Sequence, residues 1–145
     1  MKAKARAASV TAMASVMLLA LAPQALANWS SVINSGGTGF ESRRWSDELY
    51  SQIKFTDCTL HYLTASKRET DVAIWRDITV LPDDKYDTKT FTACFSGGGT
   101  SNGKWTDLGS GKKSVYFRIQ SVGGSSTEGS TFDAAFVGIE TTQAD

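Results

Sequence analysis

The sequence has few of the residues that zinc sites and histidine-dependent catalysis require. Among its 145 residues it has one histidine, His61, and two cysteines, Cys58 and Cys94. One histidine and two cysteines do not supply the usual four ligands of structural zinc. Catalytic histidines act beside a nucleophile or a carboxylate, and the chain has no nucleophile-elbow serine motif. We therefore expect His61 to be a structural or surface residue.

The chain also lacks a sustained apolar pattern at helical spacing. Beyond residue 27, no apolar run approaches the roughly 20 residues that a membrane-spanning helix needs. Short alternating apolar stretches, separated by Gly, Ser, Asp and Asn, are present instead. Alternation of this kind predicts strands joined by turns.

Residues 1–27 have the three parts of a secretory signal peptide in the expected order. Three basic residues lie within the first six, an apolar stretch follows over 10–22, and Ala25-Leu26-Ala27 provides small residues for cleavage. The apolar stretch is about 13 residues long, which is too short to span a membrane. The pattern predicts cleavage after Ala27, a single mature domain over 28–145, and secretion from a bacterium. We expect no membrane insertion of the mature protein.

The charge of the mature segment argues against a nucleic-acid partner. The whole chain has 15 basic and 15 acidic residues, and three of the basic ones lie in 1–27. The mature balance is therefore 12 against 15, a net charge of −3. Nucleic-acid binders concentrate positive charge in a patch or stripe. We expect no nucleic-acid partner.

Seven or eight strands are predicted for the mature segment. They fall in the ranges 40–45, 49–63, 72–80, 88–95, 104–108, 114–122 and 132–139, after a polar, glycine-rich start over 28–39. In the second range the apolar face changes near Thr56-Asp57, which indicates a bulge or bend. In the last range, Phe132, Ala134 and Phe136 are predicted to share one face. No crossover helix is visible, so an antiparallel β-sandwich is expected, with either immunoglobulin-like or jelly-roll strand order.

The two cysteines are expected to form a disulfide. In an oxidising compartment an isolated pair of cysteines is most simply bonded. A Cys58–Cys94 bond closes a loop of about 37 residues, and such a loop contributes about 3–4 kcal/mol by restricting the unfolded chain. Two buried thiols are the alternative.

Aromatic residues are the most suggestive candidates for a binding surface. Exposed rings stack on sugars or anchor protein partners, whereas buried rings only pack a core. Trp75 lies opposite the alternating Val72, Ile74, Ile78 and Val80, so it is predicted to point outward. Trp105 follows the glycine-rich segment 96–103, where a recognition loop would place it. The candidate binding residues are Trp45, Trp75, Tyr86 and Trp105.

Asp83, Asp84 and Asp87 form the densest acidic cluster and are the candidate residues for calcium binding. Calcium takes several oxygen ligands from a loop, but this spacing does not match an EF-hand. Aspartates also favour turns by bonding their own backbone. Apart from calcium, no cofactor is expected.

The function expected from these features is binding without catalysis. We expect a small secreted β-sandwich that binds an extracellular protein or a glycan, as an inhibitor or a toxin-like effector does. A small carboxylate-dependent hydrolase is one alternative, because a chain with 15 acidic residues always brings some pair close together. A structural cell-surface protein is another.

Overall fold

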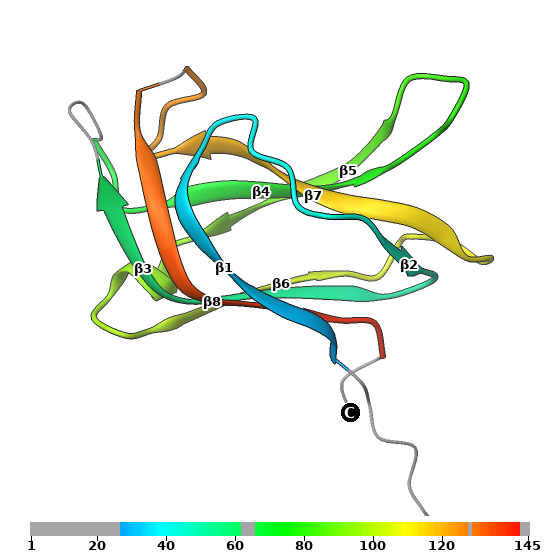
Figure 1. The fold of residues 1–145 in the computed structure, drawn as a ribbon, viewed down its shortest axis with the longest axis horizontal. Helices are drawn as coiled ribbons and strands as arrows, with labels where there is room; N and C mark the ends of the chain where they lie inside the picture. Colours follow the sequence, from blue (N-terminus) through cyan, green and yellow to red (C-terminus); the bar gives the residue numbers. More distant parts are fainter. Residues whose placement is uncertain (1–26, 62–65, 128, 143–145) are drawn as a thin grey trace, which may run out of the picture.

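The computed structural model describes residues 27–61, 66–127 and 129–142 (Figure 1). Most of the predicted signal peptide, 1–26, therefore lies outside the described residues. The described part has eight strands and one short 3-10 helix: β1 (Ala27–Gly37), β2 (Trp45–Asp47), β3 (Ser51–His61), β4 (Thr70–Arg76), β5 (Asp84–Phe91), η1 (Ala93–Phe95), β6 (Thr100–Trp105), β7 (Lys113–Val122) and β8 (Thr131–Glu140). None of its helices is long and apolar enough to cross a membrane.

The strands form two packed four-stranded antiparallel sheets, so the predicted β-sandwich is confirmed. Sheet A has the order β1-β8-β3-β6, and sheet B has the order β2-β7-β4-β5. Strand β1 thus pairs with β8, β2 with β7, β3 with β6, and β4 with β5. The chain is folded back on itself at the β4–β5 connection and then rolled, which is the jelly-roll arrangement. This order decides between the two arrangements that the sequence left open.

Phenylalanine rings fill much of the space between the sheets. The centroid of the Phe55 ring lies 4.9 Å from that of Phe91, 5.5 Å from that of Phe117 and 5.9 Å from that of Phe132. All four side chains are essentially inaccessible to solvent. Burying a side chain of this size contributes about 1.5–3 kcal/mol, so this cluster is a large part of the stabilisation of the fold.

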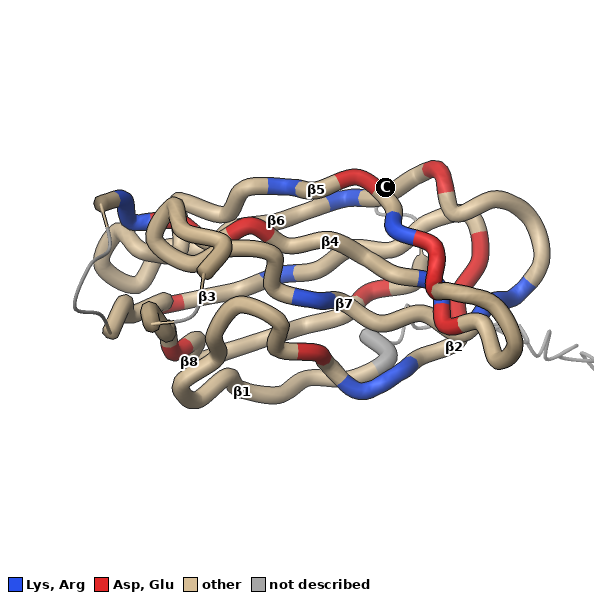
Figure 2. Tube along the Cα trace, turned by 90° about the horizontal axis from the view of Figure 1, so that it is seen from above, with Lys and Arg blue, Asp and Glu red and all other residues tan. Residues whose placement is uncertain are grey.

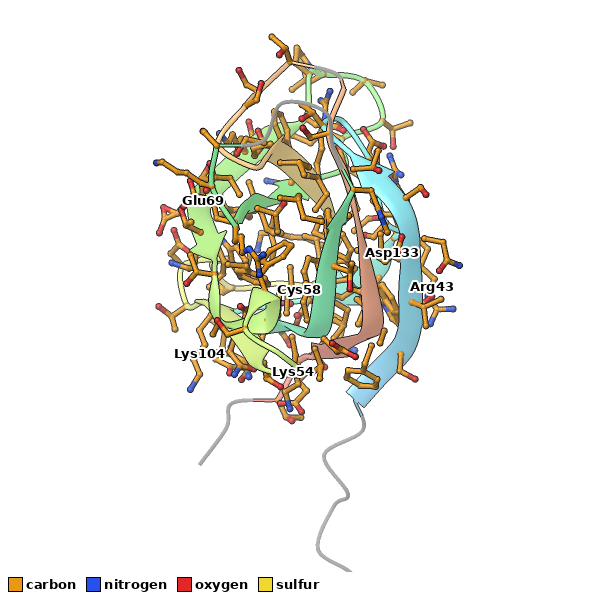
Figure 3. The ribbon with its side chains drawn as sticks, turned by 90° about the vertical axis from the view of Figure 1, so that its left-hand side faces the viewer. Arg43, Lys54, Cys58, Glu69, Lys104 and Asp133 are labelled. Carbon is orange, nitrogen blue, oxygen red and sulfur yellow. A yellow bond between two sulfur atoms is a disulfide. The ribbon has the colours of Figure 1, made fainter. Side chains whose placement is uncertain are left out.

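The disulfide between Cys58 and Cys94 is confirmed. It joins β3 to η1, and the two Cα atoms are 5.0 Å apart. Cys94 was expected within a strand, but β5 ends at Phe91 and the chain turns through η1 before β6. Figure 3 looks onto this end of the sandwich, with Cys58 near its centre. We call this the disulfide end.

The predicted change of face in β3 occurs at Asp57. Ile53 and Phe55 are buried before it, Cys58 is buried after it, and Asp57 itself has a φ of 52°. The partner strand β8 changes face at the same level, because Ala134 and then Val137 are buried. Phe136 consequently points outward and is 41% exposed, so the prediction that it shares a face with Phe132 and Ala134 is wrong.

Several predicted strand bounds are also wrong. The polar start is strand β1, because it pairs with β8 along the edge of sheet A. The strand predicted over 72–80 ends at Arg76, and Val80 is 86% exposed in the loop that follows it. The expected strand over 104–108 is β6, Thr100–Trp105, so half of the glycine-rich segment belongs to a strand. In β1 and β6, backbone pairing thus overrides the local composition.

Candidate functional site

The connection between β4 and β5, residues 77–83, exposes two large aliphatic side chains in succession. Val80 is 86% exposed and Leu81 is 66% exposed, the two highest values among the large hydrophobic residues described. Pro82 follows them and fixes the backbone φ at this point. The loop stands away from the two sheets at one corner of the molecule (Figure 1). We call residues 77–83 the β4–β5 loop.

The side chain of Asp83 closes the base of the β4–β5 loop. Its Oδ1 accepts a hydrogen bond of 3.0 Å from the backbone N–H of Ile78, which joins the two sides of the loop. Its Oδ2 accepts a hydrogen bond of 2.7 Å from the hydroxyl of Tyr116 on β7. The backbone N–H of Asp77 also donates to the carbonyl of Ser114, at 2.9 Å. The loop is therefore held at both ends and fixed to the neighbouring strand.

Arg44 forms two ion pairs and a cation–π contact beside the base of the β4–β5 loop. Its Nε lies 3.3 Å from Asp77 Oδ2, and its Nη2 lies 3.2 Å from Glu41 Oε2. Its guanidinium carbon lies 4.0 Å from the centre of the Tyr116 ring. The Arg44 side chain is 42% exposed, so these contacts contribute little to the free energy of folding. Their effect is to fix the positions of Asp77 and Tyr116.

The same hydrogen bonds shift the acidity of the groups at the loop base. The pKa of Asp83 is lowered, first because the Ile78 amide donates to its carboxylate and next because Tyr116 does. The pKa of Tyr116 is raised to about 12, first by burial and next by its hydrogen bond to Asp83. Asp83 therefore remains ionised, and Tyr116 remains a donor, at neutral pH.

Two further connections lie at this end of the sandwich, which we call the loop end. Arg76 on β4 and Trp45 on β2 both pair with Val115, so the β2–β3 turn lies at the same end as the β4–β5 loop. In that turn Leu49 is 57% exposed and has a φ of 60°. Its N–H donates to the carbonyl of Gly109 in the β6–β7 connection, at 3.1 Å. The loop end thus carries three exposed aliphatic side chains.

The charge of the β4–β5 loop is acidic. Residues 77–84 contain three aspartates and neither lysine nor arginine. Over the rest of the described chain, basic and acidic segments are interspersed and do not form a single field (Figure 2). Anionic lipid surfaces attract basic segments, so an aliphatic tip flanked by carboxylates is a poor match for such a membrane.

Two of the predicted binding aromatics are core residues, which corrects the expectation that they are exposed. Trp45 is 7% exposed, and its Nε1 donates to Ser51 Oγ at 3.3 Å. Trp105 is 1% exposed, and its Nε1 donates to the carbonyl of Asp87 at 2.8 Å. A Cβ at Gly103 would lie 2.8 Å from the Trp105 ring, so the glycine makes room for the indole. The glycine that suggested a recognition loop instead serves packing.

The other two candidate aromatics are partly buried. Trp75 pairs with Tyr116 on β7, and the Arg118 guanidinium carbon lies 5.6 Å from its ring centre. Tyr86 donates from its hydroxyl to the carbonyl of Leu108 at 3.3 Å, and burial raises its pKa. Tyr86 therefore braces the β6–β7 connection. Neither ring offers a fully exposed stacking surface.

The structure does not bring the three candidate calcium ligands together. The described residues include no group of three His, Cys, Asp or Glu side chains that could hold a metal ion. Asp83 is bonded to Ile78 and Tyr116, and Asp87 Oδ2 accepts from Lys89 Nζ at 3.1 Å. Asp84 and Asp87 lie three residues apart along β5, which separates their backbones by about 10 Å.

His61 is an exposed residue on the outer face of sheet A. Its Nε2 lies 2.7 Å from Asp133 Oδ2, and the two side chains are 50% and 40% exposed. Asp133 Oδ1 also accepts a hydrogen bond from the backbone N–H of Ser35, at 2.7 Å. The pKa of Asp133 is lowered, first by the Ser35 amide and next by His61. The pair links three segments of the sheet.

The described residues also line two cavities away from the β4–β5 loop. The larger, about 440 Å³, lies at the disulfide end and is lined mainly by polar residues, among them Asp57, Lys67 and Arg68. Its lining flanks residues 62–65, which are outside the described part of the chain, and we assign no site to it. The smaller, about 180 Å³, is lined by Trp29, Phe40 and neighbours, and lies below the usual size of a small-molecule pocket.

The sequence did not single out Val80 and Leu81 as functional residues. Val80 was assigned to the buried face of an alternating strand, and Leu81 to its end. Arg76 interrupts that alternation, and two aliphatics before Pro-Asp-Asp form a turn rather than a buried strand. That interruption is the signal that could have identified an exposed tip.

Comparisons of the chain with protein-family models, with curated proteins and with solved structures find no match.

Proposed function

We propose that this chain is an exported bacterial binding protein whose β4–β5 loop docks into an apolar pocket of an extracellular protein. The observation that carries the proposal is the combination of two highly exposed aliphatics with a loop base that is held in place. Val80 is 86% and Leu81 is 66% exposed, and Asp83 bridges Ile78 and Tyr116 beneath them. A loop held in its bound shape loses less conformational entropy on binding.

Export is supported by one feature of the sequence and one of the structure. The N-terminal segment has the basic start, short apolar stretch and small-residue end of a signal peptide. The Cys58–Cys94 disulfide fits an oxidising compartment outside the cytoplasm. In that setting, an inhibitor or toxin-like effector that inserts an exposed loop into another protein is the class we favour.

A protein is a better occupant for the loop tip than a glycan or a membrane. Sugars stack on aromatic rings, and the tip offers branched aliphatic side chains with no ring. The three aspartates of residues 77–84 oppose an anionic lipid surface. Apolar anchors in a partner's pocket, surrounded by polar residues, are the usual arrangement of a protein interface.

The experiment compares the wild-type chain with the double variant Val80→Ser/Leu81→Ser. Both are produced with their own N-terminal segment, recovered from the medium, immobilised, and exposed to extracellular protein fractions from competing bacteria and from host tissue. The matched control is Val32→Ser, because Val32 is a 52% exposed valine on β1, outside the loop. We expect a discrete protein to be retained by the wild type and the control but not by the loop variant.

Stability is measured for the same three proteins. Exposed substitutions of this kind change the free energy of unfolding by no more than about 0.5 kcal/mol, so loss of binding with unchanged stability supports direct contact. Equal retention by all three proteins contradicts the proposal. Retention on anionic vesicles that depends on Val80 and Leu81 identifies a lipid surface instead and also contradicts it.

A further inference from the structure

The outer face of sheet A carries one large exposed ring that rests on a glycine. Phe136 on β8 is 41% exposed. A Cβ at Gly138 would lie 2.8 Å from Phe136 Cε1 and 3.0 Å from its Cζ. The ring therefore lies over the backbone at Gly138, which no other residue type would allow without moving it. The glycine fixes the ring against the sheet and leaves part of it open to solvent.

Polar side chains surround this ring on the neighbouring strands. In the β3–β8 register, Thr56 pairs with Phe136 and Lys54 pairs with Gly138. Lys54 Nζ lies 3.9 Å from Glu140 Oε1, so an ammonium group and a carboxylate lie side by side. Figure 3 shows Lys54 on the outside of the molecule.

The polar surface continues across β3 to β6. Thr56 Oγ1 lies 2.9 Å from Thr100 Oγ1, and Asn102 Oδ1 accepts from Gln52 Nε2 at 3.1 Å. Asn102 pairs with Lys54 in the β3–β6 register, so its amide lies in the same row as Gly138. We call the surface formed by Lys54, Thr56, Asn102, Phe136 and Glu140 the sheet A platform.

We infer that the sheet A platform binds a saccharide. A sugar has an apolar face of C–H groups that stacks on an aromatic ring, and a rim of hydroxyls that bonds to amide, hydroxyl and charged groups. Phe136 provides the ring, and Lys54, Asn102 and Glu140 provide donors and acceptors around it. This inference rests on residues of sheet A and does not depend on the β4–β5 loop.

The composition of the platform favours a sugar over a second copy of the chain. A stable protein interface has a cluster of apolar anchors at its centre, well removed from solvent. Here Val32, on the adjoining strand β1, is the other large exposed hydrophobic residue near Phe136 in the register of the described strands. One ring among polar neighbours is a small anchor for a protein but matches the size of one sugar unit.

The test titrates the exported protein with hexasaccharides of glucose, xylose, mannose, galactose and N-acetylglucosamine, observed by amide chemical shifts and calorimetry. At sugar concentrations up to about 10 mM, we expect at least one hexasaccharide to shift the amide signals of Phe136, Lys54 and Asn102. Phe136→Leu keeps an apolar side chain but removes the ring. Gly138→Ala keeps the ring but displaces it. Each is expected to lower the association constant about tenfold.

Two controls make the outcome decisive. Thr59→Ala changes an exposed residue of β3 away from the ring and should leave sugar binding unchanged. Val80→Ser/Leu81→Ser should also bind sugar normally, so failure of the platform and failure of the loop proposal are distinguishable. Absence of shifts with every hexasaccharide overturns the inference. So does a wild-type dimer that Phe136→Leu converts to a monomer, because the platform is then a self-association surface.

Discussion

The two ends of the sandwich are stabilised by different kinds of interaction. At the disulfide end, Cys58 is bonded to Cys94, and Phe95 packs against Phe132 with ring centroids 5.9 Å apart. All four of these side chains are buried. At the loop end, the β4–β5 loop is held by hydrogen bonds to the partly exposed carboxylate of Asp83, and Val80 and Leu81 face solvent.

We infer from this difference that the disulfide end mainly stabilises the fold, whereas the loop end mainly determines recognition. Buried apolar contacts and a covalent bond stabilise the fold strongly, whereas exposed polar contacts stabilise it little and mainly determine geometry. A change at the disulfide end should therefore act on the free energy of unfolding, and a change at the loop end should act on the shape and binding of one loop. The predictions below test this division.

The largest effect on stability is expected from removing the disulfide. In the double variant Cys58→Ala/Cys94→Ala, the free energy of unfolding should fall by about 3–4 kcal/mol, because the unfolded chain regains the freedom of a loop of about 37 residues. Urea unfolding of the variant and the wild type measures this. At temperatures where the variant is folded, the amide signals of Val80 and Leu81 should be unchanged. A shift of these signals would show that the two ends are coupled, which contradicts their separate roles.

A second, smaller effect should follow from Asp47, a buried carboxylate at the loop end. Asp47 is 4% exposed, and its Oδ2 is buried without a hydrogen-bond partner. Burial is the main cause of its raised pKa. The native state therefore holds this proton more tightly than the unfolded state, so stability should rise as pH falls from neutral through the raised native pKa, with the gain complete below the ordinary value of 3.8.

The variant Asp47→Asn isolates this contribution. Because asparagine does not titrate, the rise in stability on acidification should be smaller than in the wild type. Urea unfolding between pH 7 and pH 4 measures both proteins. Parallel pH profiles for the two proteins would show that Asp47 does not carry the effect.

A smaller effect on stability than loss of the disulfide, but a large local effect, is expected for Asp83→Ala. The substitution removes the acceptor for the Ile78 amide and for the Tyr116 hydroxyl. Hydrogen exchange at Ile78 should accelerate at least about tenfold, while exchange in the central strands stays unchanged. Thr79→Ala, an exposed change in the same loop, is the control. If exchange at Ile78 does not change in Asp83→Ala, the carboxylate does not hold the loop.

The loop contact of Asp83 should persist in mildly acidic solution. The hydrogen bonds that lower its pKa stabilise the fold above the ordinary value of 3.8, and this contribution is lost as pH falls through the lowered native pKa. The Ile78 amide should therefore stay protected at pH 5. Loss of protection at that pH would contradict the lowered pKa.

The sequence predicted the class of the fold and its disulfide because these depend on strong local patterns. Alternation along 114–122 and 132–139 identified the central strands β7 and β8, and the isolated Cys58 and Cys94 identified the bond. It missed β1, which is polar and is a strand because it pairs with β8. Pairing is a long-range property that a local composition of Ser, Asn and Gly does not reveal.

The candidate site was predicted less well, for a related reason. Trp105 was expected to be a binding residue just after a recognition loop, because glycines precede it, but Gly103 provides the space for its buried ring. Phe136 was expected on the same face as Phe132 and Ala134, because alternation alone does not show the change of face that occurs beside Asp57. Exposure of a single side chain depends on such irregularities, whereas fold class depends on the average pattern.

The central claim is that the β4–β5 loop presents Val80 and Leu81 from a fixed backbone. Backbone amide order parameters of the protein test it directly, at Ile78, Val80 and Leu81. We predict values close to those of the strands, about 0.8, because Asp83 and Ser114 hold the base of the loop. Order parameters below about 0.6 at these amides would show a flexible loop and contradict the account.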